Sequence, residues 1–241
     1  MNVFIHRAKS RGYFDHGGLR TYHTFSFADY FNSRRMHFGA LRVLNDDTLD
    51  GGEGFGLHAH HNMEIVTIPL HGTLSHIDNL GNEEAIRKGQ IQVMSAGSGI
   101  RQSEYNKNPD KTVNFLQIWV VPDRLEVEPR YQEITVDDRL IPGQFNEIVS
   151  PYPGNGRSAR IHQQAWFSMG GFGPGTEVAY PLKSGESEGV YLFVIDGEVS
   201  LQEDITLGPR DGIGLTDIRQ LYFKTRSQAE ILLIEVPPMK R

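Results

Sequence analysis

Cysteine is absent from the 241 residues of this chain. Without a thiol, the protein forms no disulfide, offers no thiolate to a metal and has no cysteine that could sense oxidants. Any response to the redox state of the cell would therefore have to pass through a bound metal or through methionine.

Long hydrophobic runs are missing as well. No apolar stretch reaches the roughly 18 residues that a membrane-spanning helix requires. The segment from Met1 to Arg7 lacks the apolar core of a signal peptide. We therefore expect a cytoplasmic protein that makes no contact with membranes. The net charge of −6 also argues against direct binding to the backbone of nucleic acids.

No long amphipathic helical pattern occurs, and short strand-like segments with Gly and Pro turns take its place. This pattern predicts an all-β fold, either a sandwich or a barrel. The segment from Phe38 to Leu44 reads as a strand that ends at Asn45-Asp46-Asp47. A second strand, Ile65 to Leu70, contains Pro69, which indicates an edge or a bulge. Residues 122–133 hold two prolines and six charges, as expected of a crossover between two domains.

Two histidines, His58 and His60, stand two residues apart behind a glycine-rich lead-in. Side chains alternate across a strand, so both imidazoles can point to one face while His61 points to the other. Gln102 and Glu104 have the same spacing. If the two strands face each other inside a small barrel, four potential ligand atoms converge. Two imidazoles and one carboxylate are the composition of a facial triad that binds Fe(II), whereas ordinary surface histidines are the alternative.

These residues carry a resemblance to a known family. Gly52, His58-Ala59-His60, Glu64 and Gly72 resemble the first cupin motif. Gly99, Gln102 and Asn106 resemble the second, in which the family has His at the position of Gln102. Four further segments narrow the resemblance to the pirins: His23 to Ala28, Leu41 to Asp47, Met63 to Ile65 and Met94 to Gly97.

The resemblance implies a bicupin, which consists of two jelly-roll β-barrels. We expect one barrel in residues 1–133, with a metal-capable site, and a cupin-like barrel without metal ligands in residues 134–241. The sequence pattern of the second half resembles that of the first, but the ligand residues are missing. Where it should repeat the histidine pair, the chain has Glu177-Val178-Ala179-Tyr180.

Pirins carry a divalent metal on three histidines and a glutamate, although some members lack the ligands. The matching positions are His58, His60, Gln102 and Glu104. The resemblance implies one divalent ion, with Fe(II) favoured and Zn, Ni, Mn, Co or Cu as alternatives. Gln102 leaves three outcomes open: it ligates through its oxygen, it hydrogen-bonds a metal-bound water, or the site is too weak to retain a metal.

The roles of the remaining polar residues are also open. Glu104 is a ligand and catalytic base, or else a rim carboxylate bonded to Arg101 or Tyr105. Glu64 reads as a buried acceptor for the N–H of a ligating histidine. His61 and His76 could in principle replace the missing imidazole, although a surface position is the commoner role of such histidines.

Some bacterial pirins resemble quercetin 2,3-dioxygenases. The sequence therefore suggests a metal-dependent dioxygenase that acts on a flavonol such as quercetin, with Glu104 accepting the hydroxyl proton. The alternative is a non-catalytic protein, either a metal or redox sensor or a scaffold, that acts through a protein partner.

Overall fold

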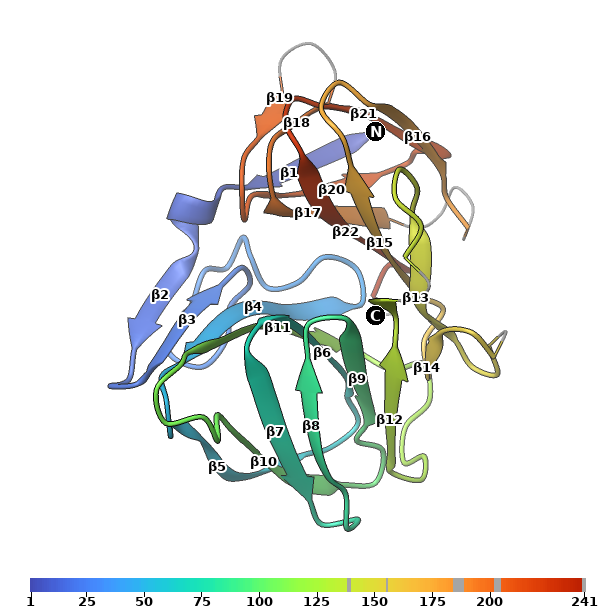
Figure 1. Ribbon diagram of the computed structural model, residues 1–241. Coiled ribbons are helices and arrows are strands. Elements are labelled where there is room, and N and C mark those ends of the chain that lie inside the picture. Colours follow the sequence, from blue (N-terminus) through green and yellow to red (C-terminus); the bar gives the residue numbers. More distant parts are fainter. Residues whose placement is uncertain (138–139, 155, 184–188, 202–204, 240–241) are drawn as a thin grey trace.

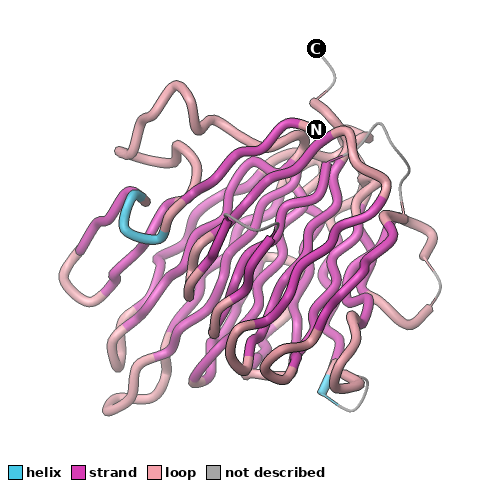
Figure 2. Tube along the Cα trace, turned by 90° about the horizontal axis from the view of Figure 1, so that it is seen from above, coloured by secondary structure: helices cyan, strands magenta, loops and turns pink. Residues whose placement is uncertain are grey.

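The computed structural model describes residues 1–137, 140–154, 156–183, 189–201 and 205–239. Strands dominate these residues, and the short helix η1 (Ala8–Ser10) lies between β1 and β2 (Figure 1). The tube in Figure 2 shows the strands of the molecule running in similar directions, joined by short loops. The predicted all-β class is therefore confirmed. In the described part of the chain, no helix has the length and apolar character required to cross a bilayer.

The first barrel consists of two antiparallel sheets. The larger sheet has the order β12-β9-β6-β11-β4-β3-β2, and the smaller one has the order β5-β10-β7-β8. The strands are β2 (Gly12–Asp15), β3 (Leu19–His23), β4 (Leu41–Leu49), β5 (Gly54–His60), β6 (Glu64–His71), β7 (Thr73–Asp78), β8 (Glu83–Arg87), β9 (Gln90–Ser95), β10 (Ile100–Tyr105), β11 (Val113–Val120) and β12 (Arg130–Thr135).

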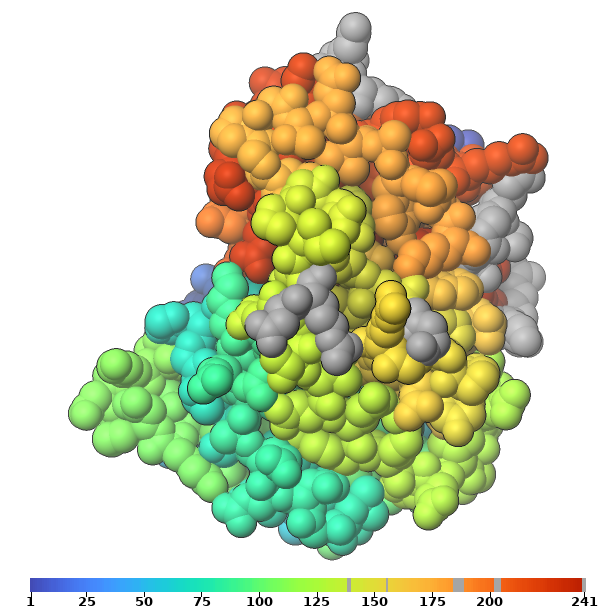
Figure 3. Space-filling model, turned by 45° about the vertical axis from the view of Figure 1, so that its right-hand side comes forward, coloured from blue at the N-terminus to red at the C-terminus, as the bar shows by residue number. Residues whose placement is uncertain are grey.

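The second barrel repeats this arrangement, with sheets ordered β1-β20-β17-β22-β15-β13-β14 and β16-β21-β18-β19. Its strands are β1 (Asn2–His6), β13 (Asn146–Pro151), β14 (Ala159–Ile161), β15 (Trp166–Phe172), β16 (Glu177–Pro181), β17 (Gly189–Asp196), β18 (Val199–Leu201), β19 (Ile205–Leu207), β20 (Gly212–Thr216), β21 (Gln220–Thr225) and β22 (Ala229–Val236). In Figure 3 the two halves form separate lobes, and the yellow-green segment of the chain lies across their junction.

The strand pairing departs from the predicted division into residues 1–133 and 134–241 at two places. Strand β1 pairs with β20 and thus belongs to a sheet of the second barrel. Strand β12 pairs with β9 through Thr135, so the first barrel extends past residue 133. At the end of β1, the buried His6 also packs against Tyr191 of the second barrel.

The apolar core is divided between the junction of the two barrels and the interior of each barrel. A large apolar cluster that includes Phe25, Leu116, Phe167 and Leu232 lies where the two barrels meet. A second apolar cluster fills the second barrel, and Tyr180 belongs to it. The apolar clusters of the first barrel are small, and buried polar side chains occupy much of the remaining interior. The interior of the first barrel is therefore the place to look for a site built from polar side chains.

Strand β4 is longer than the sequence suggests, because it continues through Asn45, Asp46 and Asp47 to Leu49. Asn and Asp are rare in strands, and the three side chains here have different surroundings. Asp46 forms ion pairs with two arginines, whereas Asn45 and Asp47 face a cavity of the first barrel. The interpretation of Pro69 is confirmed, since the pairing of β6 with β11 shifts register beside it.

Candidate functional site

Two imidazoles meet at the end of β5 in the first barrel. The rings of His58 and His60 lie edge to face, with centroids 4.8 Å apart. Nδ1 of His58 lies 2.8 Å from the carbonyl oxygen of Gly56. This nitrogen must therefore carry the proton and donate it, which leaves the lone pair on Nε2. Burial, together with the neighbouring His58, lowers the pKa of His60 to about 4, so His60 is a neutral ring at neutral pH.

Gln102 lies beside these rings, since it pairs with His58 across the adjacent strands β5 and β10. The strands are thus hydrogen-bonded neighbours and do not face each other across the barrel. Nε2 of Gln102 lies 3.3 Å from Nε2 of His58 and 3.1 Å from Nε2 of His60. Its Oε1 is buried and has no hydrogen-bond partner. To ligate a cation through that oxygen, the amide would have to rotate by half a turn.

Glu104 lies deeper, with only 1% of its surface exposed. A β-bulge between Gln102 and Glu104 sets it beside Phe55 of β5. Its Oε2 accepts a 2.9 Å hydrogen bond from Nε2 of Gln117, and its Oε1 has no partner. Burial raises the pKa of Glu104 to about 7. The alternative in which Glu104 is a rim carboxylate bonded to Arg101 or Tyr105 is therefore wrong.

Gln117 is itself fixed by Trp119, whose indole Nε1 lies 3.2 Å from Oε1 of Gln117. An indole N–H can only donate, so Gln117 must turn its oxygen to Trp119 and its nitrogen to Glu104. The ring of Trp119 also packs edge to face on His60, at 5.0 Å between centroids. One indole thus orders both the carboxylate and an imidazole of the site.

The donor set fits a divalent metal in part. Among the described residues, no group of three or more His, Cys, Asp or Glu side chains lies close enough together to hold a metal ion. The structure does bring together two imidazoles and the amide of Gln102. In addition, the unpartnered oxygens of Gln102 and Glu104 are buried acceptors that a cation would satisfy. His58, His60 and Gln102 could hold such an ion, and Glu104 could join them as a ligand or act beside them as a base.

A cavity of about 470 Å³ opens next to this donor set, within the range of ~300–1,000 Å³ common for small-molecule sites. Phe27, Phe55 and Trp119 give it aromatic walls. Its lining also includes His58, His60 and Glu104. The cavity can therefore accept a flat aromatic molecule whose polar edge meets the imidazoles and the carboxylate.

Sequence reasoning missed two further residues of this cavity, His23 and Asp47. His23 is nearly buried, its Nδ1 has no partner, and burial lowers its pKa to about 4. Asp47 is buried, which raises its pKa to about 8, so it is protonated at neutral pH. The alternation of Asn45 and Asp47 along β4 is the signal that could have placed Asp47 on the cavity side.

Three other sequence expectations have definite outcomes. Glu64 does not support a ligating histidine, because the turn after His60 breaks the alternation and its carboxylate accepts a hydrogen bond from Ser95 instead. His61 faces away from the cavity, as predicted, and contacts Glu126 at 2.9 Å. His76 is fully buried rather than on the surface, and its Nε2 contacts Asp78 at 3.0 Å.

Comparison with known proteins places this arrangement in a family. The family model described as Pirin matches residues 5–120, and the model described as Quercetinase C-terminal cupin domain matches residues 147–236. Quercetin 2,3-dioxygenase of Escherichia coli is 34% identical over 237 residues, which cover 98% of this chain and 100% of that protein. A Pirin-like protein of Caulobacter vibrioides is 35% identical over 221 residues, which cover 92% of this chain and 94% of that protein.

A solved structure agrees with these matches. The bacterial pirin YhhW from Escherichia coli in complex with nickel(II) superimposes with a TM-score of 0.91 at 34% identity, covering 99% of this chain and 100% of that chain. The similarity extends over both barrels. The chain therefore belongs to the pirin family and is a bicupin.

Proposed function

We propose that this protein is a metal-dependent dioxygenase that acts on a flavonol such as quercetin. The observation that carries the proposal is the convergence of two imidazole Nε2 atoms on Gln102, beside a buried carboxylate with a free oxygen and at the wall of an aromatic cavity. The names of its relatives support the same assignment, since they include a quercetin 2,3-dioxygenase and a nickel(II)-bound pirin.

The ligands in this proposal are His58 and His60, with Gln102 and Glu104 completing the set. The metal is one divalent ion, Fe(II) in the first instance, while Ni, Zn, Mn, Co and Cu suit imidazole and oxygen donors as well. Bound there, the ion would supply Lewis acidity toward a deprotonated hydroxyl of the substrate.

The protein's own groups prepare the substrate for reaction with O2. Phe27 and Trp119 hold the flavonol rings in the cavity. Glu104 accepts the proton of the flavonol hydroxyl, which its pKa near 7 permits at neutral pH. Gln117 and Trp119 keep the carboxylate turned toward the cavity, and the depth of Glu104 in the barrel shields it from water.

The test measures both the metal content of the protein and the rate at which it consumes quercetin. The protein is loaded with each divalent ion in turn, its metal is counted per chain, and the loss of quercetin absorbance and the uptake of O2 are followed in air. One metal per chain and steady consumption of both reactants are expected. A variant with both His58→Ala and His60→Ala is the control for oxidation of quercetin by free metal, and an equal rate in that variant would remove the enzymatic assignment.

A second function has its own supporting observation. An amide replaces the third imidazole, and the described residues contain no group of three or more His, Cys, Asp or Glu side chains that could hold a metal ion. This composition favours weak metal retention and a role as a sensor or scaffold that acts through a protein partner. Metal retention without any O2 uptake with flavonols would favour the sensor, and failure to retain any metal would favour the scaffold.

A further inference from the structure

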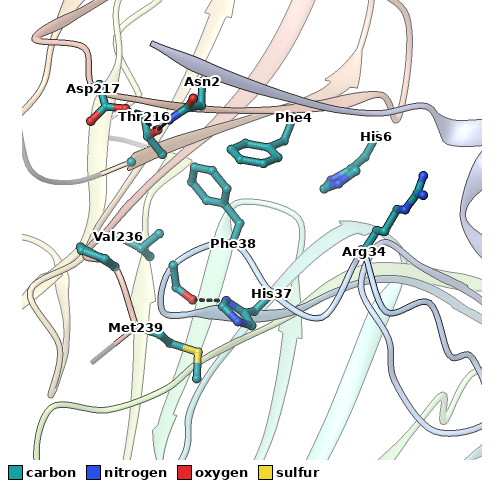
Figure 4. A pocket seen from close by; sticks show the side chains of 13 residues that line it. Asn2, Phe4, His6, Arg34, His37, Phe38, Thr216, Asp217, Val236 and Met239 are labelled. Carbon is teal, nitrogen blue, oxygen red and sulfur yellow. Dashed lines mark hydrogen bonds between the residues drawn. The ribbon is translucent and has the colours of Figure 1, made fainter. Parts of the chain in front are cut away.

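A second cavity, of about 520 Å³, lies at the junction of the two barrels. Five separate segments line it (Figure 4). They are β1 with Phe4 and His6, the loop with Arg34, His37 and Phe38, Gly189 of β17, Thr216 and Asp217 at the end of β20, and the segment with Val236 and Met239. This cavity is distinct from the one at His58 and shares no lining residue with it. Ligand binding in this cavity is therefore independent of the proposed dioxygenase activity.

The aromatic floor of this cavity is held in place by close packing. The rings of Phe4 and Phe38 lie edge to face, with centroids 6.1 Å apart. Phe38 packs directly on Gly189 and Gly214, where an added Cβ would stand 2.6 and 2.4 Å from its ring carbons. Only glycine at these two positions leaves room for the ring. Phe4 is 48% exposed, so an aromatic surface is available to a ligand without rearrangement of the protein.

One cationic group at the cavity has no partner. The guanidinium of Arg34 makes no hydrogen bond or ion pair with any described residue. Its neighbours are engaged, because Arg35 donates to Ser10 and Arg42 donates to the carbonyls of Ser26 and Met36. A planar guanidinium suits two-point binding of a carboxylate. In Figure 4 Arg34 and His6 lie on one side of the two phenyl rings.

The polar groups on the other side are already satisfied. Oδ2 of Asp217 lies 2.9 Å from Nδ2 of Asn2 and 3.1 Å from Oγ1 of Thr216. Both partners are neutral groups, so hydrogen bonds hold this carboxylate in place without a counter-charge among the described residues. One ring nitrogen of His37 also has a partner, because its Nδ1 lies 3.0 Å from the carbonyl oxygen of Gly39. The cavity thus has the guanidinium of Arg34 on one side of the phenyl rings and the carboxylate of Asp217 on the other.

We propose that the cavity at the barrel junction binds an aromatic monocarboxylate. The ring of the ligand stacks against Phe4 and Phe38, and its carboxylate pairs with the guanidinium of Arg34. The apolar floor explains the preference for an aromatic body, and the guanidinium of Arg34, which has no partner among the described residues, explains the preference for a negative charge on the same side. The amide and amine analogues of the same ring lack this match.

The test uses 2-naphthoate, whose fluorescence reports binding, on the full-length protein. Arg34→Gln should weaken binding by about tenfold or more, since it removes a charged partner. Arg87→Gln, which changes an exposed arginine of β8, is the matched control and should change binding by less than about twofold. Phe4→Ala should also weaken binding, and 2-naphthamide should bind about tenfold less tightly than 2-naphthoate.

Several outcomes would overturn this proposal. These are no binding of 2-naphthoate up to about 5 mM, equal binding of 2-naphthamide or of 2-naphthylmethylamine, and equal binding to the Arg34→Gln variant. Loss of binding in the variant with His58→Ala and His60→Ala, with no effect of Arg34→Gln, would move the ligand to the first barrel and likewise contradict the proposal.

Discussion

The amide nitrogen of Gln102 lies 3.1 Å from Nε2 of His60 and 3.3 Å from Nε2 of His58, so it bridges the two imidazoles. An amide can turn either its donor or its acceptor to this position, whereas an imidazole offers a metal a stronger nitrogen ligand. Under the proposed function, Gln102 is therefore the position at which an added imidazole should change the affinity for a metal most directly.

Replacing this amide by imidazole should strengthen the site. We expect Gln102→His to tighten metal binding by about tenfold or more, because imidazole is a better donor to borderline metals than a neutral amide oxygen. Competition with a chelator measures the affinity, and Gln90→His on β9 controls for an added imidazole elsewhere in the barrel. Equal affinities of wild type and Gln102→His would mean that Gln102 does not contribute to metal binding.

Glu104→Gln separates the basicity of the carboxylate from its shape. The variant keeps the size of the side chain and can still accept a hydrogen bond from Gln117, but it cannot take up the hydroxyl proton. At one metal per chain, we expect a fall of about 100-fold or more in quercetin consumption. Glu83→Gln, at an exposed site on β8, should leave the rate unchanged.

The outcomes of Glu104→Gln distinguish two roles. Full activity with full metal content would show that Glu104 is not the base. Weaker metal retention would support the ligand role of Glu104, and activity would then be measured after the metal is restored at a higher concentration.

Much of the fold could be predicted because strand period and turn residues are local properties. The pairing of His58 with His60 on one side of β5 follows from that period alone. The period fails where the backbone departs from a regular strand. Glu64 lies beyond a turn, so its predicted position beside the histidines was wrong. The β-bulge near Phe55 and Gln102 is likewise not visible in the sequence.

Contacts between distant segments account for the other differences. The end of β4 was placed too early because Asn45, Asp46 and Asp47 look like a turn. Their partners include Arg210 of the second barrel, which no local pattern connects to β4. The exchange of β1 into the second barrel has the same origin, since its pairing with β20 joins residues more than two hundred positions apart.

Asp46 is expected to contribute strongly to stability. Its carboxylate contacts Arg11 at 3.3 Å and Arg210 at 3.2 Å, and it accepts a 2.8 Å hydrogen bond from Asn114. The side chains of Arg11 and Asp46 are only 4% and 9% exposed. Asp46→Ala leaves a buried guanidinium without its counter-charge, so the free energy of unfolding should fall by about 3 kcal/mol.

Urea denaturation measures this effect. Asp50→Ala is the matched control, because the pair of Arg20 with Asp50 is 36% and 42% exposed and should contribute about 1 kcal/mol or less. Similar losses in the two variants would show that the contact between the barrels at Asp46 is no stronger than a surface ion pair.

The last prediction concerns acid sensitivity and His6. Burial, followed by the charge of Arg35, lowers the pKa of His6 to about 4 from the ordinary 6.5. Between these values the unfolded chain binds a proton that the folded chain does not, so the free energy of unfolding falls as the pH falls from 6.5 toward 4. Above pH 6.5 both states are neutral and His6 adds no pH dependence.

His6→Gln should remove this contribution, because glutamine does not titrate and can still bond to the hydroxyl of Tyr191, which lies 2.9 Å from Nδ1 of His6. Between pH 7.5 and pH 5, the metal-free wild type should lose about 1–2 kcal/mol more of its unfolding free energy than the variant does. Urea denaturation at the two pH values measures the difference. His71→Gln changes an exposed histidine and should behave like wild type, whereas equal losses in wild type and His6→Gln would show that His6 titrates normally in the folded protein.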